Sequence, residues 1–240
     1  MRGIRERLGL KNPLCLAIDL SERDQGIALL RDLGPLVGMV KCGPVPFLSW
    51  GKDFLVTAES LRIPVFLDLK WHDIPNTVFE TLLRLPSPAI RMVTIHAQGG
   101  TAMISAARKS LDSLGPEPPA LIAVTLLTHL TEAEVKEMGY PSREEGVVRL
   151  GSVALSSGAD GLVMSPGELS RARMLWGESP FFVTPGIRPK GPTSAWDDQF
   201  NARSPQEALT EGSDLLVVGR PIIAGPNPRE ATLSLLAELA

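Results

Sequence analysis

The chain has 240 residues, of which 44% are hydrophobic, 21% are charged and 5% are aromatic, and its formal net charge is −3. This length suits one large α/β domain, and the composition supplies enough apolar side chains for a sizeable core. The small net charge, the scarcity of aromatic residues and the lack of long Lys or Arg runs argue against a nucleic-acid-binding protein.

The cysteines and the N-terminal segment indicate the cellular compartment. Cys15 and Cys42 each lie inside an apolar run, so we predict two core thiols in a reducing environment and no disulfide. The first residues, MRGIRERLGLKNP, are charged and lack the apolar stretch of a signal peptide. No segment approaches the ~18 uncharged apolar residues of a membrane span. We therefore expect a cytoplasmic protein with no membrane partner.

Eight short apolar runs alternate with segments of helical periodicity. The predicted strands span residues 14–20, 38–43, 65–70, 91–97, 120–127, 161–165, 181–186 and 214–219. The predicted helices span residues 21–33, 46–61, 75–85, 101–114, 143–157, 166–176, 204–211 and 228–240. Short runs rich in Leu and β-branched residues are typical of parallel strands that are buried on both faces. Eight such strand–helix pairs predict a closed (β/α)8 TIM barrel, a single domain of the α/β class over residues 1–240.

Local signals refine this prediction. Ser21, Pro75 and Ser204 stand where three of the predicted helices begin. No Gly-x-Gly-x-x-Gly pattern follows the first strand, which argues against dinucleotide binding. Residues 184–200 form the one long irregular connection, and a long loop in a compact domain is usually a lid or a binding loop.

Polar side chains close several of the apolar runs, and in a (β/α)8 barrel the carboxyl ends of the strands carry the active site. The residues concerned are Asp19, Lys41, Asp68, Lys70, His96 and Thr128, with Asp73 in the loop after the third run. Asp68 and Lys70 are two positions apart, so in a regular strand they face the same way with Cα atoms roughly 6.6–7 Å apart. Both side chains are therefore expected to point into the mouth of the barrel.

Together with Lys41 and Asp73, these two residues would form a neutral array of two ammonium groups and two carboxylates. Each opposite charge within about 4–6 Å favours the ionised form of its neighbours. A protonated lysine held in this way can deliver a proton to a carbanion as it forms, which a decarboxylation without an electron-sink cofactor requires. The alternative interpretation is a structural ion-pair network at the rim of the barrel.

The stretch FLDLKWHDIPNTV at residues 66–78 resembles the signature of the orotidine 5'-phosphate decarboxylases, in which an Asp-x-Lys-x-x-Asp-Ile-Pro-Asn-Thr pattern ends the third strand. The segments AIDL, VKCG, TLLTHL, PGIR, DDQ and VGRPI are similar to further parts of that family in the same order. The resemblance spans residues 14–222. It implies that orotidine 5'-monophosphate is decarboxylated to UMP and CO2 in de novo pyrimidine biosynthesis, with neither cofactor nor metal.

The resemblance also implies a role for each site residue. Lys70 would protonate C6 of the pyrimidine ring, and Asp68 would lie beside the departing carboxylate. Lys41 and Asp73 would complete the charge array and bind the ribose hydroxyls, Asp19 would bind the ribose, and Thr128 would lie beside the base. Asp73, Ile74 and Thr77 would reach into the partner's site, which implies a homodimer with shared active sites.

The phosphate-binding positions implied by the resemblance are Arg188, Gln199, Gly219 and Arg220. Their placement agrees with the general rule that barrels bind phosphate after strands seven and eight. Phosphate contacts and closure of the loop at residues 187–200 would then supply remote binding energy for the reaction.

Some features leave alternatives open. His129 stands where many relatives have a serine or another small polar residue, and His72 and His96 are interpreted as structural residues satisfied by local hydrogen bonds. A metal site at Asp68, His72 and Asp73 has no standard ligand spacing. A related group of magnesium-dependent sugar-phosphate decarboxylases carries an acid at the second-strand position, where Lys41 stands here. The other alternative is a barrel that binds nucleotides without catalysis, which the loss of a charged array residue would indicate.

Overall fold

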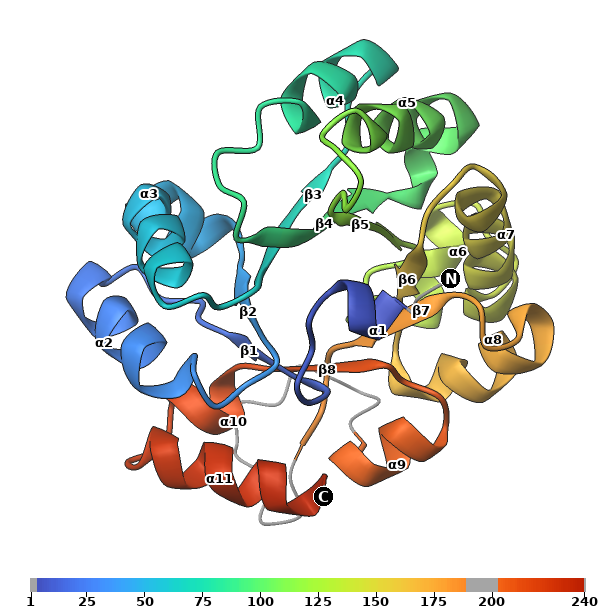
Figure 1. Ribbon diagram of the computed structural model, residues 1–240. Coiled ribbons are helices and arrows are strands. Elements are labelled where there is room, and N and C mark those ends of the chain that lie inside the picture. The colour runs from blue at the N-terminus through green and yellow to red at the C-terminus, as the bar shows by residue number, and fades with distance from the viewer. Residues whose placement is uncertain (1–3, 189–202, 240) are drawn as a thin grey trace.

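The computed structural model describes residues 4–188 and 203–239. At its centre, eight parallel strands follow one another in chain order and close into a barrel, as seen from one end in Figure 1. The strands are β1 (Leu14–Ala17), β2 (Met39–Cys42), β3 (Val65–Trp71), β4 (Ile90–His96), β5 (Ala120–Val124), β6 (Gly161–Val163), β7 (Phe181–Thr184) and β8 (Leu215–Val218). Leu14 of β1 lies opposite Leu216 of β8, which closes the ring. The prediction of a (β/α)8 barrel is confirmed.

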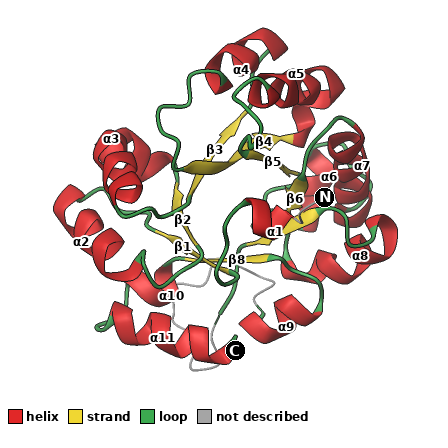
Figure 2. Ribbon diagram, in the orientation of Figure 1, coloured by secondary structure: helices red, strands yellow, loops and turns green. Residues whose placement is uncertain are grey.

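Helices surround the strands, as Figure 2 shows. They are α1 (Ile4–Arg7), α2 (Arg23–Leu33), α3 (Pro44–Ser60), α4 (Pro75–Leu82), α5 (Gly100–Asp112), α6 (Glu132–Glu137), α7 (Arg143–Ser156), α8 (Leu169–Trp176), α9 (Pro205–Thr210), α10 (Arg220–Ile223) and α11 (Pro228–Glu238), with 3-10 turns η1 (Ala97–Gly99) and η2 (Pro166–Glu168). Eight of the helices correspond to the predicted ones. The short helices α1, α6 and α10 were not predicted, because four to six residues are too few to establish a helical period. No helix in the described parts of the chain is long and apolar enough to cross a membrane.

The helix-start signals have different outcomes. Pro75 is the first residue of α4, and Ser204 caps α9 in a reciprocal capping box with Glu207, as predicted. Ser21 does not cap α2: this helix begins at Arg23, and its N-cap residue, Glu22, makes no capping hydrogen bond through its side chain. That prediction was therefore wrong by about one position, which is the usual uncertainty of a helix end.

In the described parts of the chain, buried apolar side chains form two clusters, one inside the barrel and one between the strands and the helices. Leu8, next to α1, packs into the inner cluster with Met92 and Phe181, so the N-terminal segment covers the bottom of the barrel. Cys15 lies in the inner cluster and Cys42 in the outer one, and both are free and buried. The predicted core thiols are confirmed. Because the strands are buried on both faces, polar side chains reach solvent only where the strands end.

Candidate active site

A cavity of about 410 Å³ opens at the carboxyl ends of the strands, within the size range of small-molecule sites. Its apolar residues include Ala17, Phe66, Val124, Val163, Val183 and Val217. Its charged residues are Asp19, Lys41, Asp68, Lys70, Arg188 and Arg220. The charged groups thus stand over an apolar floor, where water screens their interactions less than it does at an open surface.

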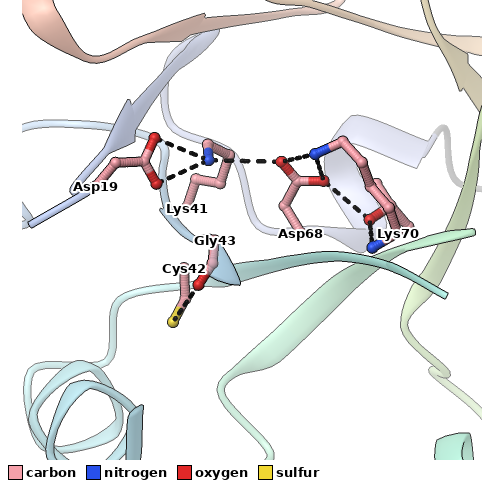
Figure 3. A network of polar contacts seen from close by, with 7 residues as sticks. Asp19, Lys41, Cys42, Gly43, Asp68 and Lys70 are labelled. Carbon is pink, nitrogen blue, oxygen red and sulfur yellow. Dashed lines mark hydrogen bonds and ion pairs between the residues drawn. The ribbon is translucent and has the colours of Figure 1, made fainter. Parts of the chain in front are cut away.

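Four charged side chains form a continuous chain across this cavity (Figure 3). The Lys41 ammonium donates to the Asp19 carboxylate at 3.1 and 3.2 Å and lies 3.5 Å from Oδ2 of Asp68. On its other side, Asp68 accepts two hydrogen bonds of 2.9 Å from Nζ of Lys70. The array alternates in sign, as expected, but within this chain its second carboxylate is Asp19 and not Asp73.

The array holds its two buried members in their ionised forms. Burial alone would lower the pKa of Lys41, but the carboxylates of Asp68 and Asp19 outweigh it and hold that pKa above the ordinary value. Burial would likewise raise the pKa of Asp68, yet Lys41, Lys70 and a hydrogen bond from Thr94 bring it below the ordinary value. The site therefore keeps Asp68 as a carboxylate and Lys41 as an ammonium group at neutral pH.

A bulge in β3 brings Asp68 and Lys70 together. Leu67 pairs with Val93 of β4 and Trp71 pairs with Ile95, so the three residues from Asp68 to Lys70 lie opposite Thr94 alone. Lys70 adopts a positive φ of 52°, a backbone conformation that non-glycine residues rarely take. The regular alternation expected of this strand is absent, and the Asp68 and Lys70 side chains meet within the bulge. Strained backbone of this kind is concentrated at functional sites.

Thr94 is a site residue that sequence reasoning missed. Its hydroxyl accepts a 2.9 Å hydrogen bond from the backbone N–H of Lys70 and donates one of 2.9 Å to Oδ1 of Asp68. The side chain is completely buried. Threonine is common in strands, so its presence in the fourth apolar run carried no signal.

The loop after β5 brings Thr128 to the cavity, together with Leu126 and Leu127. His129 is exposed and does not line the cavity, so the departure from the family pattern at this position lies outside the site of this chain.

The ring of His96 lies 5.6 Å from that of His72, measured between their centroids. Nδ1 of His96 is buried and has no hydrogen-bond partner among the described residues, so local hydrogen bonds do not satisfy this atom. The interpretation of His72 and His96 as structural residues stays a prediction. Burial, followed by the neighbouring His72 and Lys70, lowers the pKa of His96.

The segment after β3 points away from the cavity of its own chain. Asp73, Ile74 and Thr77 are exposed, and the Ile74 side chain is 66% accessible. One carboxylate oxygen of Asp73 accepts a 2.6 Å hydrogen bond from the backbone N–H of Ile74. None of the three residues lines the cavity described above.

Three of the four predicted phosphate positions lie at one side of the cavity. Arg188 follows β7, and Gly219 and Arg220 follow β8. A Cβ atom at Gly219 would lie 3.3 Å from that of Ala17, so the backbones run close together there. Gln199 lies outside the described residues, as does most of the loop at residues 187–200. Ile187 pairs with Arg203, so the two ends of that connection are joined beside Arg188.

Acidic, histidine and cysteine side chains do not gather around a metal position in residues 4–188 and 203–239. The ammonium group of Lys41 lies between Asp19 and Asp68, the two carboxylates of the array. A cation placed there would be repelled by that group.

Comparison with known proteins decides the family. The model of the Orotidine 5'-phosphate decarboxylase / HUMPS family matches residues 12–235. The chain belongs to this family. The resemblance based on residues 66–78 is therefore confirmed for nearly the whole chain.

Individual members of the family are similar along their full length. The orotidine 5'-phosphate decarboxylases of Legionella pneumophila (strain Corby) and Paramagnetospirillum magneticum are 39% and 41% identical to this chain, over 94% and 95% of it and 98% of each relative. The crystal structure of orotidine 5'-phosphate decarboxylase from Lactobacillus acidophilus has a TM-score of 0.83 at 34% identity, covering 95% of this chain and 99% of that one.

Proposed function

We propose that this protein decarboxylates orotidine 5'-monophosphate to UMP and CO2 in pyrimidine biosynthesis, without metal or cofactor. Family membership and relatives that carry this name at about 40% identity support the reaction. The observation that carries the proposal is the Asp19–Lys41–Asp68–Lys70 chain over an apolar floor. It supplies a proton donor next to a fixed negative charge, and Lys41 occupies the position where the magnesium-dependent alternative requires an acid.

In the proposed reaction, the bond between C6 of the pyrimidine ring and the carboxylate carbon breaks, and CO2 leaves. The electron pair stays on C6 and takes a proton from the Lys70 ammonium, which later recovers a proton from water. Asp68 lies 2.9 Å from Nζ of Lys70 and would hold it beside C6. Lys41 keeps Asp68 charged through the cycle, since it remains paired with this carboxylate when Lys70 gives up its proton.

The remaining residues would bind the nucleotide. Asp19 and Lys41 are assigned to the ribose hydroxyls, and Thr128 to the edge of the base. Arg188, Gln199, Gly219 and Arg220 are assigned to the phosphate, since arginine guanidinium groups match phosphate oxygens in a forked geometry. Binding energy from the phosphate, remote from the reacting carbon, would hold the pyrimidine against the charged array.

We further propose that the active enzyme is a homodimer in which Asp73, Ile74 and Thr77 complete the partner's site. Their exposure supports this, because contact with a partner would remove the apolar surface of Ile74, which is 66% accessible in the single chain, from water. The free buried thiols suit a cytoplasmic enzyme, and we assign the catalytic function to the whole chain as one domain.

Mixing two inactive variants tests the shared site. A Lys70→Ala protomer paired with an Asp73→Asn protomer would form one site with both native residues, so random exchange is expected to restore about a quarter of the native activity. Each variant alone should stay inactive. Mixtures that remain inactive although the subunits exchange would show that Asp73 acts within its own chain, and an active Asp73→Asn protein would show that this carboxylate is not needed.

The reaction is tested by following the absorbance of orotidine 5'-monophosphate after adding EDTA-treated protein, with Lys70→Ala as the control. Turnover by the native chain that is lost in a folded Lys70→Ala protein supports the proposal. Absence of turnover, or turnover that appears only with added magnesium, would contradict it and favour a binding protein or a sugar-phosphate enzyme.

A further inference from the structure

A buried arginine behind the cavity contacts the loop that carries Thr128. Arg143 is the first residue of α7 and is only 9% accessible. Its guanidinium donates to the backbone carbonyls of Leu130 at 2.9 Å and Leu127 at 3.2 Å. These two carbonyls flank Thr128, so one side chain holds the loop on both sides of it.

The same guanidinium also binds the segment that follows β6. Nε of Arg143 donates to Oε1 of Glu168 at 2.8 Å, and Nη2 donates to the Ser165 hydroxyl at 3.2 Å. The second oxygen of Glu168 accepts a 2.7 Å hydrogen bond from the Ser165 backbone N–H. The loop after β5 is thereby tied to the loop after β6 through a buried ion pair.

Helix stability alone does not explain this arginine. A positive charge in the first turn of a helix opposes the helix dipole, and burying it has a desolvation cost. The forked guanidinium of Arg143 instead makes several hydrogen bonds to two loops at the cavity end of the barrel. Leu127 and Thr128, which line the cavity, belong to the loop that it holds.

We infer that Arg143 is a positioning residue, which holds the loop after β5 so that Thr128 faces the pyrimidine base. The inference rests on the proposed function for its substrate. Arg143 does not line the cavity, so it acts through the Leu127 and Leu130 carbonyls and not by touching the nucleotide.

The chain offers a matched control at the opposite end of the barrel. Arg173 is equally buried, donates to the Gly212 and Pro180 carbonyls, and pairs with Asp214 at 2.6 Å. These partners precede β7 and β8, far along the strands from the cavity. Replacing Arg173 therefore removes a similar set of bonds without affecting the loop after β5.

The test compares Arg143→Ala with Arg173→Ala. We expect Arg143→Ala to raise KM for orotidine 5'-monophosphate about tenfold with a smaller change in kcat, as for a lost hydrogen bond that binds substrate and transition state alike. Both variants are expected to lower Tm, and by similar amounts. Arg173→Ala, unlike Arg143→Ala, is expected to leave KM unchanged.

Guanidinium ion provides a second readout that a merely structural role would not give. A separate cavity of about 340 Å³ lies beside Arg143 and is lined by Glu132 and Glu168, so the space left in Arg143→Ala is open to a small cation. Guanidinium chloride at millimolar concentration should restore KM in Arg143→Ala, whereas neutral urea should not, and Arg173→Ala should not respond to either. The rate of backbone amide hydrogen exchange in residues 125–131 should be higher in Arg143→Ala than in the native protein, and guanidinium should lower it again.

An unchanged KM in Arg143→Ala, or a KM change equal to that of Arg173→Ala with no guanidinium effect, would overturn the inference. Measuring the native protein alongside distinguishes a failure of the proposed function from a failure of the positioning role of Arg143. If it shows no turnover, the proposed function fails, and exchange in residues 125–131 then decides whether Arg143 holds the loop.

Discussion

Replacing Thr94 with valine would remove one hydroxyl from the charged site and leave the shape of the side chain almost unchanged. That hydroxyl links the Lys70 backbone N–H to Oδ1 of Asp68, with 2.9 Å to each. In Thr94→Val the N–H loses its partner, and Asp68 keeps only its lysine contacts. The positive φ of Lys70 is unfavourable for a non-glycine residue, so once this hydrogen bond is lost we expect the backbone to relax away from the native bend.

The expected magnitude follows from these two bonds. A hydrogen bond to a charged group contributes about 1.5–3 kcal/mol, and an orphaned buried amide costs about 1–3 kcal/mol. Since one hydroxyl serves both, we expect the free energy of unfolding to fall by about 3 kcal/mol. A displacement of Lys70 by about 1 Å would lower kcat by about 100-fold, or roughly 2.7 kcal/mol in activation free energy.

The assay measures kcat and KM for orotidine 5'-monophosphate, together with urea denaturation, in Thr94→Val and Thr94→Ser. Serine keeps the hydroxyl, so Thr94→Ser should retain most of kcat, while KM should change little in either variant because Thr94 does not line the cavity. A folded Thr94→Val protein with kcat within about threefold of native would show that the Thr94 hydroxyl does not position Lys70. Equal losses in both variants would assign the effect to the methyl group.

Three further predictions concern charge and assembly. Lys41→Met should lower the free energy of unfolding by about 3 kcal/mol in urea. The lowered pKa of Asp68 means that its stabilising charge is present above the unfolded pKa and is lost as the pH falls through the folded one. Without Lys41 this pKa is lowered less, so Lys41→Met should lose less stability on acidification than the native protein; an unchanged pH profile would contradict this. Arg220→Ala should raise KM for orotidine 5'-monophosphate by about 10- to 100-fold and leave turnover of orotidine, which has no phosphate, unaffected; equal losses on both substrates would argue against a phosphate contact. Ile74→Arg should convert the proposed dimer to inactive monomers in sedimentation, and an active monomer would contradict the proposed shared site.

The barrel and the ends of its strands were predictable because of how such a fold is buried. Parallel strands covered on both faces must be apolar along their length, so charged residues such as Asp19, Lys41 and Asp68 are visible where they close a run. The presence of those three residues in one cavity, next to Thr128, follows from the closed order of the strands.

The details of the site depend on contacts that the sequence pattern does not specify. The bulge in β3 changes the register against β4, and no glycine or proline marks it. Thr94 and Arg143 act through hydrogen bonds to backbone groups distant in sequence, and neither stands at a strand end. Asp19 pairs with Lys41 because β1 and β2 are neighbours in the barrel, whereas a contribution of Asp73 to the array from the partner stays a prediction.

In the proposed reaction, this chain breaks the bond between C6 and the carboxylate, and places a solvent-derived proton on C6, without a metal. The most direct measurement is mass and proton magnetic resonance analysis of the product formed by EDTA-treated protein in deuterium oxide. We expect UMP with one deuterium at C6 and an equal amount of CO2, and no product from Lys70→Ala. Unchanged orotidine 5'-monophosphate, or product formed equally well by Lys70→Ala, would contradict it.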